Sequence, residues 1–198
     1  MLERIRQAAA RSTLLRTLAF VRVQSPFATR YNLVYPGLLS AFSTALLFLA
    51  IDDISIFSRG GLVSSIVPFL SILAPFYVAA LAAVSTFAGK PDFDEKFKMT
   101  EPVVLNIPGE RGAPEDVEIT QRHFLSLLFG YCCVVSLALL LFSIAVPVFS
   151  GVVPIASSDG LWIIKSAVFF VFSFALFQVI ILTLLAVYYL ADKIHRPW

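Results

Sequence analysis

The chain has 198 residues, of which 59% are hydrophobic and 14% charged, and its formal net charge is +2. A soluble domain of this length cannot bury so much apolar surface, so the composition excludes a soluble globular protein and indicates an integral membrane protein. The small net charge gives no indication of a direct nucleic-acid ligand.

The first 32 residues form a basic arm with six arginines and one acid, Glu3. At about 100° per residue, several arginines share one face and leucines group beside them. This pattern predicts a weakly amphipathic helix that lies on the membrane surface and ends near Ser25-Pro26. A nucleic-acid-binding arm is the alternative, but basic flanks are usual beside membrane spans. The arm lacks the compact apolar core and cleavage site of a signal peptide.

Residues 33–88 are predicted to form the first transmembrane hairpin. Its spans cover 33–51 and 62–88, each long enough to cross a hydrocarbon core of about 30 Å. Pro68 and Pro75 predict a bend in the second span, because each proline removes a backbone hydrogen bond. Small residues recur along one face of each span and predict close helix packing, also between copies of the chain. These helix-packing residues are Gly37, Ala41 and Ala45 in the first span, and Ser71, Ala79 and Ala83 in the second.

Residues 89–122 form a bridge between the two hairpins, with eight acidic and five basic residues. Apolar residues alternate at 103–107 and again at 117–119, which predicts two short strands paired as a hairpin. The competing interpretation starts the third helix early, over 115–120. The bridge is too apolar for a solvated linker, so we expect it to pack on the chain's own membrane helices, on a neighbouring copy or on another protein. The candidate docking residues are Leu105, Ile107, Glu115, Asp116 and Glu118.

Residues 123–191 are predicted to form the second hairpin. Thr120 is a suitable N-cap for a third span over 121–149. Gly130, near the start of this span, belongs to a further small-residue packing pair.

The fourth span covers 161–190 and is longer than a bilayer requires, so it should tilt or project beyond the membrane. Gln178 lies near its centre, where an amide is costly in lipid. It predicts hydrogen bonding between helices, with the lining of a pore as the alternative. The tail, 192–198, is short and basic.

Basic residues concentrate in the arm, the bridge and the tail, whereas the connections at 52–61 and 151–160 hold only Arg59. Under the positive-inside rule, both termini and the bridge lie in the cytoplasm. The fold class that follows is an all-α integral membrane protein of the inner (plasma) membrane, with four transmembrane helices in two hairpins.

The sequence carries no catalytic signature. The two histidines, His123 and His195, have no neighbours at metal-ligand spacing, and no phosphate-binding loop or nucleophile elbow is present. Cys132 and Cys133 are interpreted as small packing residues. Lys165 is the only ionisable side chain inside a span, which disfavours an ion-coupled transporter. We expect no enzyme activity, no metal and no cofactor.

Size, four spans, a basic arm at Arg4–Arg30, the acidic bridge and the tail at Lys193–Trp198 resemble the small four-helix membrane subunits of bacterial antiphage defence systems, most of all the KwaA-like subunits of Kiwa. The resemblance is one of topology. It implies a homo-oligomeric membrane sensor that binds a soluble cytoplasmic protein, itself a nucleic-acid-interacting effector.

Two functions follow. In the first, the chain is an oligomeric scaffold or sensor in contact with membrane lipids, and its bridge recruits the soluble partner. In the second, it is a pore whose opening depolarises the membrane. The absence of charged rings in the spans disfavours a selective ion path.

Overall fold

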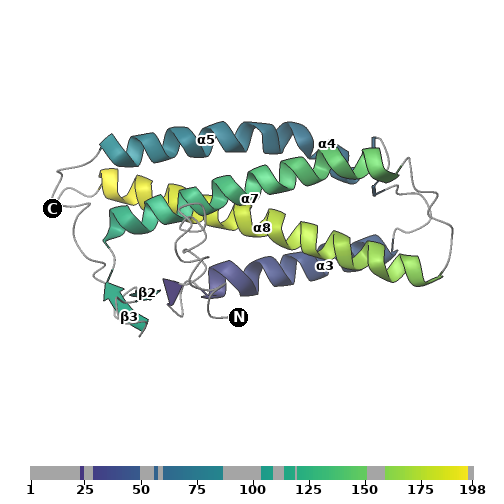
Figure 1. Cartoon of the computed structure of the whole chain (residues 1–198), viewed down its shortest axis with the longest axis horizontal. Helices are drawn as coiled ribbons and strands as arrows, with labels where there is room; N and C mark the ends of the chain where they lie inside the picture. Colours follow the sequence, from purple (N-terminus) through teal and green to yellow (C-terminus); the bar gives the residue numbers. More distant parts are fainter. Residues whose placement is uncertain are drawn as a thin grey trace.

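The computed structural model describes residues 23–24, 29–49, 56–57, 60–86, 104–108, 114–118, 120–150 and 159–195. Long helices make up most of this part of the chain, and a small sheet lies at one end of them (Figure 1). Expectations for the first 22 residues, the last three and the connecting loops fall outside the described residues.

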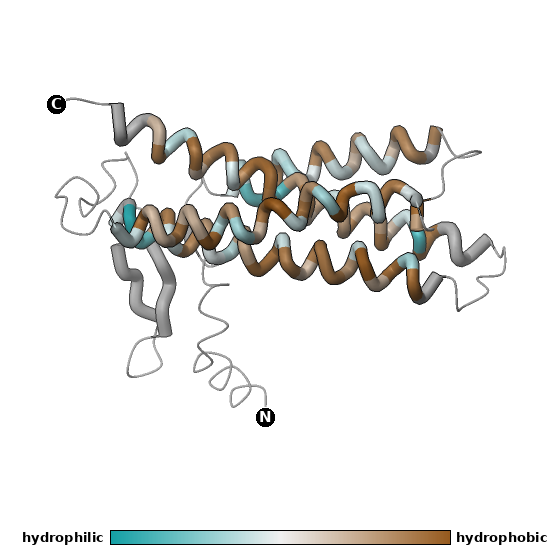
Figure 2. Tube along the Cα trace, turned by 90° about the horizontal axis from the view of Figure 1, so that it is seen from above, coloured by the Kyte–Doolittle hydropathy of each residue, from teal (hydrophilic) through white to brown (hydrophobic). Residues whose placement is uncertain are grey.

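Three of the described helices are long and apolar enough to cross a membrane. They are α5 (Val67–Thr86), α7 (Gln121–Ser150) and α8 (Asp159–His195), with 20, 30 and 37 residues. Hydrophobic residues dominate along the helices (Figure 2). The chain is therefore a membrane protein. The start of α7 at Gln121 agrees with the predicted third span, and Thr120 caps it: the His123 N–H donates to Thr120 Oγ1 over 3.3 Å.

The first apolar segment forms a shorter helix than the predicted span over 33–51. α3 (Tyr35–Leu49) has 15 residues and follows a π-helical turn, η2 (Arg30–Val34). Pro36 has no N–H and cannot donate to the carbonyl of Asn32, four residues before it, which interrupts the regular helical pattern here. α3 consequently runs beside only part of α8 (Figure 1). In the described residues, three helices rather than four reach the length of a complete span.

The second apolar segment is divided near its start. α4 (Leu62–Ser65) is separated from α5 by Ile66, two residues before Pro68, whose missing N–H cannot bond the Ser64 carbonyl. Pro75 lies inside α5 without ending it. Gly60 takes a φ of 81°, in the left-handed region that favours glycine, and turns the chain into α4.

The helices pack in the order α5, α7, α8, α3. α5 lies against α7, α7 against α8, and α8 against α3 (Figure 1). The two helices of the predicted first hairpin therefore do not form one of the main contacts with each other in the described part of the chain. Each packs instead against a helix of the second hairpin.

The contact between α4–α5 and α7 is built from large side chains at a seven-residue spacing. This spacing turns one seam of a helix toward a single neighbour. The fully buried residues on the first side are Val63, Leu70, Tyr77 and Val84. Buried residues on α7 recur every three or four positions, at Leu125, Leu128, Cys132, Ser136, Leu139 and Ser143.

Three short strands form an antiparallel sheet in the order β1 (Val23–Gln24), β2 (Val104–Pro108) and β3 (Pro114–Glu118). β3 occupies the residues that the competing interpretation gave to an early turn of the third helix. Val23 and Gln24 are strand rather than the continuing surface helix predicted for the arm, because β2 offers them a pairing edge.

Candidate functional site

The register of the sheet places one group of apolar residues on a single face. Residues directly opposite each other in antiparallel strands share a face, and alternate residues of one strand share it too. Leu105 pairs with both Val23 and Val117, and Ile107 pairs with Glu115. We call these five positions the apolar face. It contains three of the five candidate docking residues, Leu105, Ile107 and Glu115.

The other two candidates lie on the opposite face. Asp116 pairs with Asn106, and Glu118 pairs with Val104, which also pairs with Gln24 on β1. We call these positions the acidic face. The sequence grouped the five candidates as one surface, whereas the register divides them, because consecutive residues of a strand alternate between faces.

The sheet has few contacts with the described helices. In the described part of the chain, no helix is among the principal contacts of any strand, and the strands chiefly contact one another. β3 is an edge strand and carries Glu115, Asp116 and Glu118 within five residues. Charge on an edge discourages indiscriminate strand pairing and favours partners of opposite charge.

A second polar site lies inside the helices, around Gln178. This side chain is 7% exposed, near the middle of the apolar stretch Ile163–Ala191. Tyr131 Oη of α7 donates to Gln178 Oε1 over 2.9 Å. Gln178 Nε2 donates to the Asn32 carbonyl over 3.1 Å and also to Asn32 Oδ1.

These hydrogen bonds explain an amide at this depth. Backbone that departs from the α-helix is tolerated inside a membrane only where protein groups satisfy it. The Asn32 carbonyl cannot take its helical bond from Pro36, and Gln178 supplies the missing donor. The network joins η2, α7 and α8, and Gln178 lies buried between these elements.

A smaller polar contact joins the outer helix α5 to α8. Tyr77 Oη and Thr183 Oγ1 lie 2.5 Å apart, and Thr183 Oγ1 in turn donates to the Val179 carbonyl over 2.6 Å. Gln178 and Thr183 lie five residues apart on α8, so this helix holds polar links to η2, α7 and α5. Such bonds contribute about 0.6 kcal/mol each on average in a membrane.

The small residues predicted for helix packing divide by exposure. Gly130 is buried, and Gly37 is half-buried beside Phe174, whose Cε2 would lie 4.0 Å from an added Cβ. The others lie on the outside of one copy of the chain: Ala41, Ala45, Ser71, Ala79 and Ala83. Their predicted role therefore concerns contact with a second copy.

Chemistry-bearing side chains do not cluster in the described residues. No group of three or more His, Cys, Asp or Glu side chains is placed there to hold a metal ion. Cys132 is buried and Cys133 half-buried, as small packing residues would be. Lys165 is exposed near the start of α8.

No protein-family model, curated protein or solved structure matches the chain.

Several residues of these sites have only weak signals in the sequence. The sequence places Asn32 at the end of the basic arm. Its backbone carbonyl lies four residues before Pro36 and therefore lacks the N–H that a regular helix would supply. Tyr77 and Tyr131 lie among apolar residues in the sequence, and the only signal of a polar role is that a tyrosine hydroxyl deep in an apolar helix requires a partner. The strand at Val23–Gln24 has no pattern of its own, because two residues cannot show alternation.

Proposed function

We propose that the chain is an oligomeric inner-membrane scaffold or sensor that docks a soluble cytoplasmic protein on its three-stranded sheet, in antiphage defence. The structural part of this proposal rests on the sheet and the bundle. The resemblance to the four-helix membrane subunits is what supports defence, and a nucleic-acid-interacting partner, in particular.

The observation that carries the proposal is the apolar face. Val23, Leu105, Ile107 and Val117 share one face of a sheet whose strands, among the described elements, chiefly contact one another. A sheet of three short strands needs a packed face for stability. Burying this face against a partner removes its apolar surface from water, at about 25 cal/mol per Å².

The acidic edge indicates the charge of the partner. The three carboxylates of β3 steer and orient a basic surface, while the apolar face contributes affinity that is independent of salt. Asp116 and Glu118 lie on the other face of the sheet from the apolar residues, so a partner that contacts both faces must extend around the edge formed by β3. A basic extended segment can contact both faces if it pairs with β3 as an added strand.

A bridge on the cytoplasmic side agrees with four crossings of the membrane. α3 ends at the end of the bundle where α4 begins, and β1, which precedes α3, pairs with the bridge strand β2 (Figure 1). The arm and the bridge therefore share a side of the bundle. In this topology the first crossing combines α3 with η2, which precedes it.

Five hydrogen-bonded polar residues of the bundle favour the scaffold over a pore. Gln178, Tyr131, Asn32, Tyr77 and Thr183 all bond to one another or to backbone within one copy. A hydrated path through the bundle requires polar groups that face the path.

The register allows a test with separate variants of each face. In Leu105→Ser/Ile107→Ser we expect capture of the cytoplasmic partner to fall at every salt concentration. In Asp116→Lys/Glu118→Lys we expect it to fall most at low salt, because exposed charges are screened beyond about 10 Å at 0.1 M. Asn106→Ala, on the acidic face without a charge, is the matched control and retains capture.

Membrane potential is recorded with a dye in the same cells. Topology is tested separately with fusion reporters: those at Met1, near Glu110 and after Trp198 are expected in the cytoplasm, and those at Asp53 and Ser157 outside. Lost capture with unchanged potential supports the scaffold. Wild-type protein that depolarises cells without a partner, and still does so with both faces altered, favours the pore. A bridge reached only from outside contradicts the proposal.

A further inference from the structure

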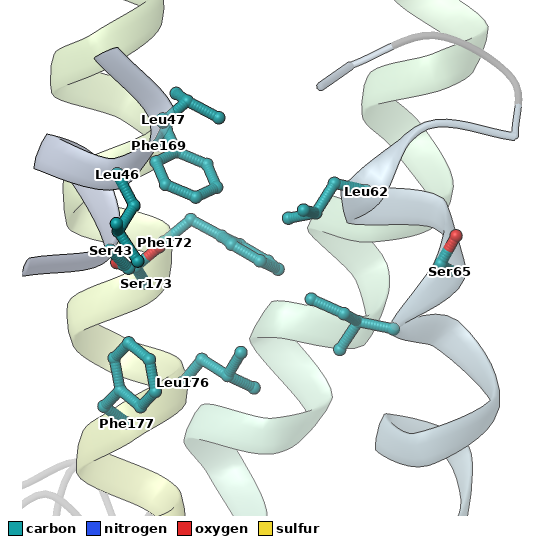
Figure 3. Close-up of a pocket in the computed structure, with 11 residues that line it drawn as sticks. Ser43, Leu46, Leu47, Leu62, Ser65, Phe169, Phe172, Ser173, Leu176 and Phe177 are labelled. Atoms are coloured by element: carbon teal, nitrogen blue, oxygen red, sulfur yellow. The ribbon is translucent and has the colours of Figure 1, made fainter. Parts of the chain in front are cut away.

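A partly open cavity of about 500 Å³ lies between α3 and the α4–α5 junction, toward the end of the bundle away from the sheet. Leu46 and Leu47 of α3 form one wall and Leu62 of α4 the other, while Phe172 and Leu176 of α8 form the floor (Figure 3). Ile66 also lines the cavity. We infer that this cleft binds one acyl chain of a phospholipid whose phosphate lies near Lys165. We call it the acyl cleft.

Three serines line the acyl cleft, Ser43, Ser65 and Ser173, and the hydroxyls of the first two donate to backbone carbonyls. Ser43 Oγ donates to the Ser40 carbonyl over 3.0 Å, and Ser65 Oγ donates to the Gly61 carbonyl over 3.1 Å. A buried water needs two to four polar partners, whereas these hydroxyl protons are already used within their own helices. Leucine, isoleucine and phenylalanine side chains provide most of the remaining surface, which suits a hydrocarbon.

The distance along α8 from Lys165 to the far end of the cleft is close to the depth of one leaflet. Twelve residues of α8 separate Lys165 from Phe177, the last lining residue on α8, which is about 18 Å of helix at 1.5 Å per residue. Half of a hydrocarbon core is about 15 Å. Phe177 precedes Gln178, so the cleft ends at the polar network near the middle of the apolar stretch.

The volume selects an acyl chain over a helix of a second copy. A helix about 10–12 Å wide fills roughly 400–600 Å³ per turn, and the floor from Phe169 to Phe177 is more than two turns long. An extended acyl chain is much narrower than a helix, so a cavity of about 500 Å³ accommodates one.

Lys165 provides the complementary charge at the open end. Its side chain is exposed and lies four residues before Phe169, so the two share one side of α8. A lysine at this position extends its ammonium toward the membrane surface, where lipid phosphates lie.

The test uses the full chain in phospholipid vesicles that contain phosphatidylglycerol with a photoreactive diazirine in one acyl chain. After irradiation, we expect adducts to concentrate in the segments 43–47, 62–66 and 169–177. Leu46→Trp fills the cleft and should lower this yield at least about fourfold, since one buried methylene is worth about 0.8 kcal/mol. Leu38→Trp, at a position of α3 that is 63% exposed and outside the cleft, is the matched control.

Leu62→Trp fills the cleft from the opposite wall and serves if Leu46→Trp fails to fold. Equal labelling of all exposed apolar positions, or enriched labelling that neither tryptophan lowers, overturns the acyl cleft. Lys165→Gln should lower labelling by the phosphatidylglycerol probe but not by a diacylglycerol with the same chains. An unchanged phosphatidylglycerol yield overturns the assignment of the phosphate to Lys165.

Discussion

The two outer helices of the bundle, α3 and α5, are attached to the central pair α7–α8 in different ways. α5 buries large side chains along its whole length, including Leu70, Tyr77 and Val84, which are fully buried. α3 turns small and polar residues toward α8, including Ser40, which is fully buried, and its start is held by Gln178.

The difference matters because helices in lipid gain little from the hydrophobic effect, and their association depends on packing and hydrogen bonds. The attachment of α5 is spread over many side chains. The attachment of α3 depends more on one network at its start. We therefore expect the loss of one polar side chain to loosen α3 more than it loosens α5.

The largest expected effect breaks the contact of α5. Leu70→Ala removes a fully buried side chain that faces α7 and leaves a cavity, which costs about 3 kcal/mol. Unfolding of the protein by SDS in mixed micelles measures this loss. Ile72→Ala, on the same helix but 69% exposed, should stay within about 0.5 kcal/mol of wild type.

In Leu70→Ala, amide exchange should rise along α5 and remain unchanged at Arg30–Val34, because η2 depends on α8. Equal losses in both alanine variants would contradict the assignment of this face to α7.

A smaller effect is expected at the start of α3. Gln178→Leu keeps the size of the side chain but removes its bonds to Tyr131 and Asn32, which should cost about 1–2 kcal/mol. The Asn32 carbonyl then has neither Gln178 nor Pro36 as a donor. Amide exchange should rise at Arg30–Val34 and in α3, with α5 unchanged.

Tyr77→Phe is the matched control for Gln178→Leu, since it removes one interhelical bond from the α5 side. Its expected cost is only about 0.6 kcal/mol, because the large buried contacts of α5 remain. If Gln178→Leu left amide exchange at Arg30–Val34 unaltered, the attachment of α3 would not depend on the Gln178 network, and α3 and α5 would not differ in this respect.

Sequence reasoning predicted the central helices better than the outer ones. α7 and α8 have uninterrupted apolar segments that exceed a bilayer's thickness, and length and composition alone identify such helices. Thr120 as N-cap follows from a local rule and is present.

The partners of the outer helices could not be predicted in the same way. The prolines and alanines of the second segment drew attention to a face that is exposed, while Val63, Leu70, Tyr77 and Val84 form the buried face at a strict seven-residue interval. That interval is legible in the sequence. The partner helix is not, because an apolar seam does not specify which of three other apolar helices covers it.

The smallest effect on a single copy is expected where the outer helices expose small residues. Ala79→Leu on α5 and Ala41→Leu on α3 add volume outside the bundle, so each should change the stability of one copy by less than about 0.5 kcal/mol. Between copies the expectation is different, because a bulky residue separates helix backbones that small residues let approach. We expect at least one of the two variants to lose its oligomer by native mass spectrometry at unchanged expression. Val78→Leu, at a neighbouring position of α5 that is 59% exposed and already large, is the control. Loss of the oligomer in Ala79→Leu alone places the contact between copies on α5. Loss in Ala41→Leu alone places it on α3, whose start Gln178 holds. In the second case Gln178→Leu should also weaken the oligomer, because a loosened α3 no longer presents Ala41 in a fixed orientation. Oligomers unchanged in both leucine variants would show that these faces contact lipid alone.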